Sequence, residues 1–453
     1  MNLELKEGLG LRKNLRGEKI FDVAVIGGGV AGLSLAALLS NKYRVVVFEK
    51  SRSLGGRARI AERDGFILDY GIHTCRFADR GVVAELFNKL GIPISFHSSN
   101  ATVYSNGFHK VPKGVKGFLK TKLLPFRGRL VLLRLMLKLL RLNPRDVVGV
   151  TVHEFVKDFT EREDVYTLVS ALVGSGIVCP DMKKASLCEA VTFAKKAVKS
   201  KYTGGYPVGG WKYIIDSLKK KIIENGGEIR LNSEVEKIEV SGNVAEGVVV
   251  RDELIDAKVI VVAFPLQRIC SIVDRHLLPK SFVEKVVNLE PTSGISLDLA
   301  LKEKVSDIDS VIITLQPVIM GQFTSNIYAE TSPKGEQLAT FYYPLPYDKM
   351  NDRKYLHRKL EEMKEMLEEM FPGILRKTKW DRVLYLKVVD GAIPKPGQTY
   401  FERPDYRCPT IENMFFVGDT TRAEGNGGDI AFRSALECAN IIENYFNYFY
   451  ERK

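Results

Sequence analysis

Three glycines and one glutamate near the N-terminus have the types and spacing of a dinucleotide site. Gly27, Gly29 and Gly32 follow a short apolar run, and Glu49 ends a second one, seventeen residues beyond Gly32. Glycine permits the tight turn and lets a pyrophosphate approach the backbone, while a helix that begins there directs free N–H groups at the phosphates. A carboxylate after the second run can accept both ribose hydroxyls of an adenosine and repels a 2′-phosphate. The pattern favours FAD or NAD over NADP.

Apolar segments on either side place these residues in a strand, turn, helix and strand. We predict strands over residues 21–26 and 44–48 and a helix over residues 33–39. Glycine clusters also make ordinary turns, but the complete order, with the acid in register, is typical of a parallel βαβ nucleotide-binding unit. The residues expected to contact the nucleotide are Gly27, Gly29, Val30, Ala31, Gly32, Glu49 and Lys50.

A second glycine turn follows the acid closely. Gly55, Gly56 and Arg57 place a guanidinium where it can face phosphate oxygens, an element that NAD dehydrogenases do not need. From here the sequence resembles the flavin-containing superfamily that includes monoamine oxidases, protoporphyrinogen oxidases and phytoene desaturases, in which such a turn follows the ribose-binding Glu. The resemblance implies that the cofactor is FAD.

The resemblance continues in three internal segments. Residues 255–265 are similar to the strand with which the family returns to its cofactor domain, and residues 234–238 to the strand whose backbone meets the adenine. By this resemblance Val235 carries the adenine contact. Residues 202–211 resemble the P-x-G-G segment of phytoene desaturases, and a helix is expected over residues 213–224.

Near the C-terminus the chain resembles the second flavin motif of the family. Residues 414–417 are an apolar run that leads into Gly418 and Asp419, and a glycine-rich turn then precedes a helix over residues 431–440. Asp419 at a strand end can accept a hydrogen bond from a ribityl hydroxyl, and N–H groups at the helix start can stabilise negative charge on a reduced flavin ring. The expected contacts are Gly418, Asp419, Gly428, Asp429 and Ile430.

Because the two motifs lie at opposite ends of the chain, the fold that they imply is discontinuous. The resemblance implies an α/β fold with a Rossmann-like FAD-binding domain of the GR2 type and an inserted α+β substrate domain. The FAD-binding domain is expected to comprise residues 1–90, 203–285 and 385–453, and the substrate domain residues 91–202 and 286–384. A chain of 453 residues is long enough for two such domains.

The two substrate-domain segments differ in pattern. The first is helix-patterned and basic, whereas the second has strand patterns at residues 293–301 and 338–343 and a charged helix over residues 353–371. Ten Lys or Arg residues and no acidic residue lie between positions 113 and 145. Four of them, Arg127, Arg134, Lys138 and Arg141, fall on one face of a predicted helix over residues 127–142.

This basic helix has two interpretations. It either lies in the interface of an anionic membrane, where a lipid-dissolved substrate would be accessible, or packs its apolar sides in the substrate domain and leaves the basic stripe to solvent. A nucleic-acid partner is not expected, because aromatic residues are not interleaved with the charge. The excess of basic residues, a net charge of +12, fits attraction to an acidic surface.

Composition limits the compartment and the cofactors. The six cysteines are widely separated without a C-x-x-C pair, so we expect reduced thiols and no metal site. The first twenty residues lack the apolar core of a signal peptide, and no apolar run is long enough to span a bilayer. The expectation is a cytoplasmic protein that is either free or peripheral on the inner face of the membrane.

Two side chains are candidates for chemistry beside the flavin. Asp429 stands where amine oxidases of the superfamily place an aromatic residue that encloses the amine, and it is either an acid or base or simply a carboxylate favoured at a helix N-terminus. His73, in a D-x-G-x-H segment similar to the family's approach to the isoalloxazine, either lines the active site or is an ordinary packed histidine. Since no cysteine stands in the context used for covalent attachment, the FAD is expected to be noncovalent.

The leading functional hypothesis is a phytoene desaturase-like FAD oxidoreductase that removes hydride from, or isomerises, an apolar isoprenoid of the carotenoid type. A flavin amine oxidase or protoporphyrinogen oxidase is the second hypothesis, weakened by Asp429. A third is a non-enzymatic module that binds prenylated proteins, as Rab GDP-dissociation inhibitors do, although their cofactor motifs are degraded and those of this chain are intact. The sequence points to no particular electron acceptor.

Overall fold

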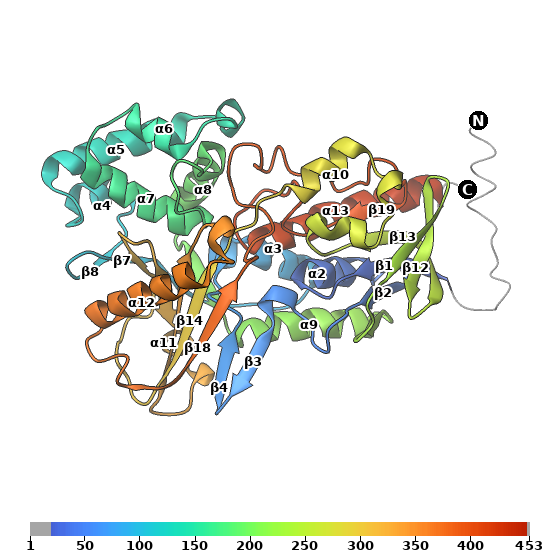
Figure 1. The fold of residues 1–453 in the computed structure, drawn as a ribbon, viewed down its shortest axis with the longest axis horizontal. Coiled ribbons are helices and arrows are strands. Elements are labelled where there is room, and N and C mark those ends of the chain that lie inside the picture. Colours follow the sequence, from blue (N-terminus) through green and yellow to red (C-terminus); the bar gives the residue numbers. More distant parts are fainter. Residues whose placement is uncertain (1–19, 451–453) are drawn as a thin grey trace.

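The computed structural model describes residues 20–450, which form a mixed α/β fold with two large sheets (Figure 1). Five parallel strands make up most of the first sheet, and an antiparallel hairpin pairs with the first half of its fourth strand. In spatial order the parallel strands are β10 (Glu228–Arg230), β2 (Val45–Phe48), β1 (Phe21–Ile26), β13 (Glu253–Val262) and β19 (Met414–Phe416). The hairpin consists of β12 (Val244–Val250) and β11 (Lys237–Ser241).

The first three elements form the predicted parallel βαβ unit. Helix α2 (Val30–Leu39) connects β1 to β2, and it begins three residues earlier than predicted because Gly29 already serves as its N-cap. The helix is apolar on all sides, as expected of an element that is almost entirely buried. Gly32 makes this close packing possible, since a Cβ atom there would lie 2.1 Å from the carbonyl oxygen of Gly27.

Helices cover both faces of the first sheet. One face packs against α2, α3 (Val82–Leu90), α9 (Gly210–Glu224) and α13 (Asp429–Phe449). The other face packs against α10 (Lys280–Val287) and the short turns before it. Strands from the N-terminal, central and C-terminal parts of the chain therefore share one hydrophobic core, as a doubly covered parallel sheet requires.

The second sheet has seven strands and belongs to the predicted substrate-domain segments. The charged helix α12 (Arg353–Met370) packs one apolar stripe against it, with Leu360, Met363 and Leu367 buried. In spatial order the strands are β18 (Thr378–Leu386), β14 (Gly294–Leu301), β17 (Gln337–Pro344), β16 (Met320–Phe323), β15 (Ile312–Thr314), β7 (Thr102–Tyr104) and β8 (Phe108–Lys110). The two strands and the helix predicted in residues 286–384 are confirmed to within a few residues.

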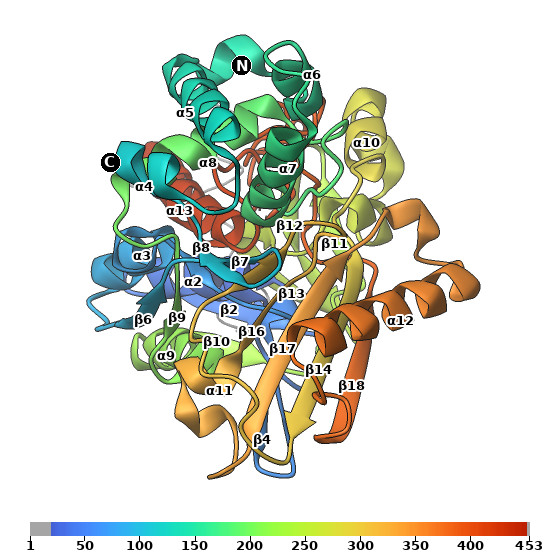
Figure 2. The same cartoon turned by 90° about the vertical axis from the view of Figure 1, so that its left-hand side faces the viewer.

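The first inserted segment is mainly helical but also supplies strands, which the sequence pattern did not reveal. Its helices gather on one side of the second sheet (Figure 2). They are α4 (Gly114–Lys120), α5 (Phe126–Arg141), α6 (Val152–Lys157), α7 (Glu163–Ile177) and α8 (Leu187–Lys199). Short strands join neighbouring segments in small sheets: β3 (Ile60–Arg63) with β4 (Phe66–Asp69), and β9 (Gly204–Pro207) between β5 (Cys75–Arg76) and β6 (Phe96–Ser99).

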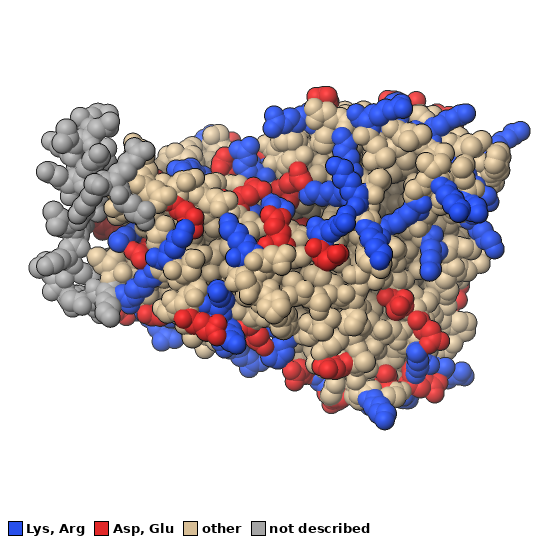
Figure 3. All heavy atoms as spheres, turned by 180° about the vertical axis from the view of Figure 1, so that it is seen from behind, with Lys and Arg blue, Asp and Glu red and all other residues tan. Residues whose placement is uncertain are grey.

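Helix α5 has the amphipathic character predicted for residues 127–142. Leu132, Leu135 and Leu139 are buried in the helical core, whereas the four basic residues of the predicted stripe are exposed. The exposed face also carries two large apolar side chains, Phe126 and Leu137, at 65% and 43% exposure. Lys and Arg side chains crowd the surface at the helical end of the molecule (Figure 3).

Residues 20–450 can be searched for disulfides, metal-binding clusters and membrane-spanning helices. There, all six cysteines are free, and His, Cys, Asp and Glu side chains form no cluster that could hold a metal ion. Among the helices of this range, each is too short or too polar to cross a membrane.

Candidate active site

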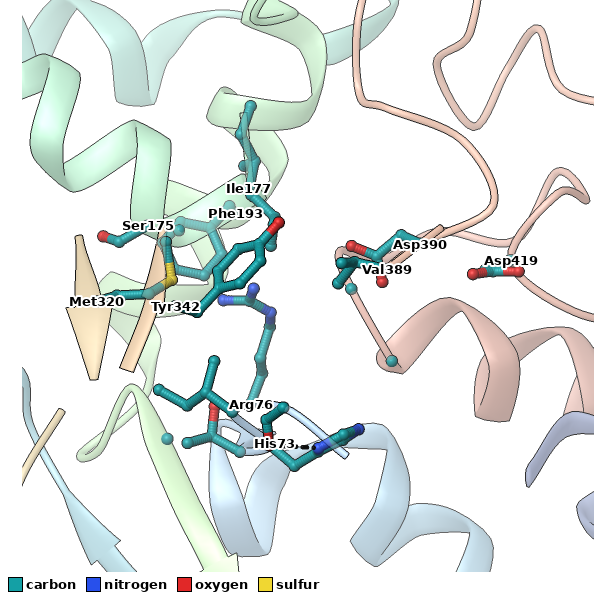
Figure 4. A pocket seen from close by; sticks show the side chains of 18 of the residues that line it. His73, Arg76, Ser175, Ile177, Phe193, Met320, Tyr342, Val389, Asp390 and Asp419 are labelled. Atoms are coloured by element: carbon teal, nitrogen blue, oxygen red, sulfur yellow. Dashed lines mark hydrogen bonds between the residues drawn. The ribbon is translucent and has the colours of Figure 1, made fainter. Parts of the chain in front are cut away.

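A cavity of about 1400 Å³ passes both glycine motifs and continues between the helical segment and the second sheet (Figure 4). The N-terminal and C-terminal motifs thus meet at one site, although they lie at opposite ends of the chain. The predicted residues that line it are Gly27, Gly29, Val30, Ala31, Glu49, Lys50, Gly55, Gly56, Arg57, His73, Gly418, Asp419 and Gly428. The predicted residues that do not line it are Gly32, Val235, Asp429 and Ile430.

The two N-terminal glycine turns are joined to each other through the backbone. Gly27 has a φ of +117°, which a residue with a Cβ atom rarely adopts. The N–H of Gly55 donates to the carbonyl of Gly28 at 2.9 Å, which holds the second turn against the start of α2. A Cβ atom added at Gly29 would meet nothing within 4 Å, so the backbone at this helix N-terminus is open to a ligand. This is the space that a pyrophosphate needs.

Glu49 lies at the end of β2 and is buried. Its two carboxylate oxygens accept hydrogen bonds from the N–H groups of Gly28 and Ser51, each at 2.8 Å. These bonds fix the side chain beside the cavity and leave further lone pairs on both oxygens. Lys50, by contrast, points toward Glu234 on the surface, with 3.7 Å between the charged atoms.

Arg57 and Asp419 form a contact that the sequence did not predict. Two guanidinium nitrogens of Arg57 donate to the two carboxylate oxygens of Asp419 at 2.6 and 2.8 Å, and Asp419 also accepts from the N–H of Gly391 at 2.6 Å. Burial alone would raise the pKa of Asp419, but the charge of Arg57 and these hydrogen bonds bring it below its ordinary value. We predicted that each residue would contact the cofactor separately, whereas the structure makes them an ion pair at the cavity wall.

The C-terminal motif presents open backbone in the same way as the N-terminal one. Gly418 has a φ of +119°, and added Cβ atoms at Gly418 and Gly428 would meet nothing within 4 Å. Helix α13 begins at Asp429, so its positive dipole end lies next to this opening, while the N–H groups of Ile430 and Ala431 donate to the carbonyls of Gly427 and Gly428. The prediction at Ile430 concerned its backbone N–H, which donates to the carbonyl oxygen of Gly427 at 3.3 Å, while its side chain is buried in the core.

The two candidate catalytic side chains have different positions. His73 lines the cavity, where its Nδ1 lies 3.0 Å from the carbonyl oxygen of Gly71, and burial together with Arg57 lowers its pKa. Asp429 is directed away from the cavity toward the backbone of Arg76. Burial raises the pKa of Asp429 to about 6. Its position is therefore explained by the helix N-terminus, and an acid–base role has no support from the geometry.

The predicted adenine-contacting strand is wrong in its bounds. Residues 234–236 are irregular, and β11 begins only at Lys237. The segment does run beside the end of β2, because the N–H of Ser233 donates to the carbonyl of Glu49 at 2.9 Å. The Val235 side chain, however, packs in the core beneath the sheet.

Sequence reasoning missed several polar residues of the cavity, three of which lie close to the C-terminal motif or on the second sheet. Arg76 and Asp390 lie close to Gly427 of the C-terminal motif, and Tyr342 extends from β17 of the second sheet (Figure 4). Burial and the charge of Asp419 raise the pKa of Asp390, whose Oδ2 accepts a hydrogen bond from Thr292 at 3.1 Å. Arg76 follows the D-x-G-x-H segment by three residues, so this position was the available signal in the sequence.

The part of the cavity beside α5, α7 and α8 is mainly apolar, although Ser175, Lys184, Glu290 and Gln322 also line the cavity. Helices α5, α7 and α8 contribute Leu135, Met136, Leu172 and Phe193, and the second sheet contributes Met320. Within residues 20–450, none of the six cysteines lines the cavity. The site thus combines a glycine-rich polar half with a mainly apolar half.

Comparison with known proteins identifies the family. Residues 30–442 match the family described as flavin containing amine oxidoreductase, a region that includes all but the first strand and the two ends of the chain. The chain belongs to this family. Its members are flavin-dependent oxidoreductases, which agrees with the resemblance inferred from the glycine motifs.

Three individual proteins illustrate how broad this family is. A 4,4′-diapolycopen-4-al dehydrogenase of Metabacillus indicus is 20% identical, with 94% of this chain and 98% of the relative covered. The chloroplastic prolycopene isomerase of Daucus carota is 28% identical over 54% of this chain and 45% of its own. A solved oxidoreductase from Methanosarcina mazei has the same fold, with a TM-score of 0.80, 22% identity and coverage of 92% and 100%.

Proposed function

We propose that this member of the flavin containing amine oxidoreductase family binds FAD noncovalently and removes hydride from, or isomerises, an apolar isoprenoid. The observation that carries the proposal is one large cavity that connects both glycine motifs to a mainly apolar lining. Two relatives with carotenoid names, a dehydrogenase and an isomerase, support the substrate class. The cysteine-free lining over residues 20–450 supports noncovalent binding.

The residues of the polar half fit the parts of the cofactor. The exposed backbone at Gly29 and the start of α2 would hold the pyrophosphate, and Glu49 the adenosine ribose. Asp419 and the N-terminal end of α13 would face the ribityl chain and the flavin ring. FAD supplies hydride acceptance and delivery at its ring system when bound.

The apolar half would orient the substrate and exclude water from the ring. Side chains such as Leu135, Leu172 and Phe193 offer no hydrogen bonds, so they favour a hydrocarbon chain and leave polar substrates poorly solvated. Because His73 has a lowered pKa, its imidazole stays neutral near pH 7 and does not place a positive charge beside a hydrocarbon.

The purified protein is expected to carry a flavin absorption spectrum. Denaturation should release this flavin into the supernatant as intact FAD, because no cysteine lines the cavity over residues 20–450. The measurement is the visible spectrum before and after acid precipitation, followed by chromatography of the released cofactor. Anaerobic addition of candidate polyenes should then bleach the flavin if hydride is removed. A protein that neither contains nor binds FAD would overturn the proposed function.

We also propose that the exposed face of α4 and α5 binds an anionic membrane surface. Lys116, Lys120, Arg127, Arg134 and Arg141 are exposed there, and none of them pairs with an acidic side chain within residues 20–450. The exposed Phe126 and Leu137 supply the apolar component that interfacial helices use. The inner face of α5 lines the apolar half of the cavity, so a bound membrane would lie next to it.

Charge reversal tests this surface. Combining Arg127→Glu, Arg134→Glu and Arg141→Glu should weaken binding to phosphatidylserine-containing vesicles about 100-fold or more, since each basic group near such a surface contributes on the order of 1 kcal/mol. Vesicle flotation measures the effect. A matched triple reversal on the exposed side of α12 (Arg353→Glu, Lys354→Glu and Arg358→Glu) should change it little. Equal losses in both triple variants would contradict a specific surface.

A further inference from the structure

Arg76 is an unusual group for a cavity whose far half is apolar. It extends from β5, and only its Nε is engaged, donating to the carbonyl oxygen of Asn426 at 3.1 Å. The two terminal nitrogens donate no hydrogen bond within residues 20–450, and no carboxylate of this range lies within ion-pair distance. A guanidinium held in this way retains two parallel donors for a ligand.

The surroundings hold this guanidinium at the boundary between the two halves of the cavity. One of its terminal nitrogens lies 3.5 Å from the Cβ position that a side chain at Gly427 would have, next to the C-terminal glycine motif. Its central carbon lies 5.5 Å from the ring centroid of Phe193, which belongs to the apolar wall. Figure 4 shows the Arg76 side chain reaching into the cavity, with His73 nearby in the irregular segment that precedes β5.

No acidic side chain among residues 20–450 forms an ion pair with Arg76. Arg57 is occupied by its bidentate pair with Asp419, and Asp390 directs one oxygen to Thr292. Burial lowers the pKa of Arg76, while Asp429 and Asp390 raise it at longer range. An arginine remains protonated under such shifts. The cavity therefore contains a fixed cation with unused donors, at the place where the apolar wall begins.

We propose that Arg76 binds a carboxylate at one end of an otherwise apolar substrate, so that the substrate is an amphiphilic polyene acid and not a pure hydrocarbon. A carboxylate matches the planar pair of donors, and its attached chain would extend along Phe193 and Met320. This inference deepens the proposed function and rests on it for the substrate class. It concerns binding alone, so it can be tested without turnover.

A matched pair of ligands tests the proposal. Parinaric acid is a fluorescent polyene acid, and its methyl ester has the same chain without the charge. The flavin-containing wild-type protein is expected to bind the acid about tenfold or more tightly than the ester, because a hydrogen-bonded ionic contact in an apolar site is worth at least that. Fluorescence titration measures both affinities.

Variants assign the effect to the guanidinium. Arg76→Met should bring the affinity for the acid down to that for the ester and leave the ester unchanged, while Arg76→Lys should retain part of the preference. Arg353→Met, on the exposed side of α12, is the control and should alter neither affinity. Equal binding of acid and ester by the wild type, binding of neither, or an equal loss of both in Arg76→Met would overturn the proposal.

The flavin spectrum separates this outcome from the proposed function. A protein with bound FAD and no preference for the acid would refute the role of Arg76 and leave the oxidoreductase proposal intact. A protein that prefers the acid through Arg76 but carries no FAD would refute the oxidoreductase proposal instead.

Discussion

Gly29→Ala should produce a protein that folds like the wild type and binds FAD about 100-fold more weakly, a loss of about 3 kcal/mol. The backbone of Gly29 has a φ of −72°, which alanine adopts readily, and the added methyl group would meet no atom within 4 Å. The folded protein therefore tolerates the change. The methyl group would occupy the space above the start of α2 through which a pyrophosphate must approach the N–H groups.

Gly32→Ala is the matched control for that prediction. Both glycines belong to the same motif, but the methyl group at Gly32 would lie 2.1 Å from the carbonyl oxygen of Gly27, so the cost falls on the fold itself. We expect a lowered melting temperature for Gly32→Ala in flavin-free protein and an unchanged one for Gly29→Ala. Melting curves of flavin-free protein and fluorescence titration with FAD distinguish the two. Normal FAD affinity in Gly29→Ala would place the pyrophosphate elsewhere.

Asp419→Ala should destabilise the flavin-free protein by about 2–3 kcal/mol. Removing one partner of a fully buried ion pair costs more, but the Arg57 side chain is 40% exposed, so solvent screens part of the interaction. The substitution removes both oxygens of the bidentate contact and the acceptor of the Gly391 N–H. Urea unfolding measures the loss. The control is Asp216→Ala, which breaks an exposed i,i+4 pair with Lys212 and should cost no more than about 0.5 kcal/mol. Similar losses in the two variants would contradict the importance of the buried pair.

The same pair predicts a dependence on pH. The pKa of Asp419 lies below 3.8 in the folded protein and returns to that ordinary value on unfolding. A depressed carboxyl pKa contributes stability above the unfolded value, and this contribution is lost as the pH falls through the folded value. The difference in stability between wild type and Asp419→Ala should accordingly be constant above about pH 4 and shrink in more acidic solution. A difference that grows on acidification would have the wrong sign for an ionised Asp419.

Much of the polar half of the site could be predicted because its geometry is local. A strand, a glycine turn, a helix start and an acid at the next strand end are encoded within about thirty residues, so Gly27, Gly29 and Glu49 were predicted with their places in the βαβ unit. Resemblance added the C-terminal motif, and its Gly418 does face the same cavity. Backbone requirements of this kind are visible in a sequence because few residues other than glycine satisfy them.

Side-chain directions were less predictable. Val235 and Ile430 were predicted as backbone contacts, and their side chains pack into the cores on the two faces of the first sheet. Asp429 was predicted to lie beside the flavin, but its carboxylate contacts the Arg76 backbone and does not line the cavity. A motif thus fixed the course of the backbone, while packing against neighbouring elements fixed where each side chain points.

By itself, the sequence determined that the chain has a flavin site. The two glycine motifs that indicate this site depend on short-range backbone geometry, and the family resemblance rests on the same motifs. Only the tertiary structure decided how distant groups combine. The ion pair of Arg57 and Asp419 spans 362 residues of chain, and Arg76 meets Phe193 across a segment of helices and strands. Contacts at such separations arise from how sheets and helices pack, and no local pattern of residues encodes them.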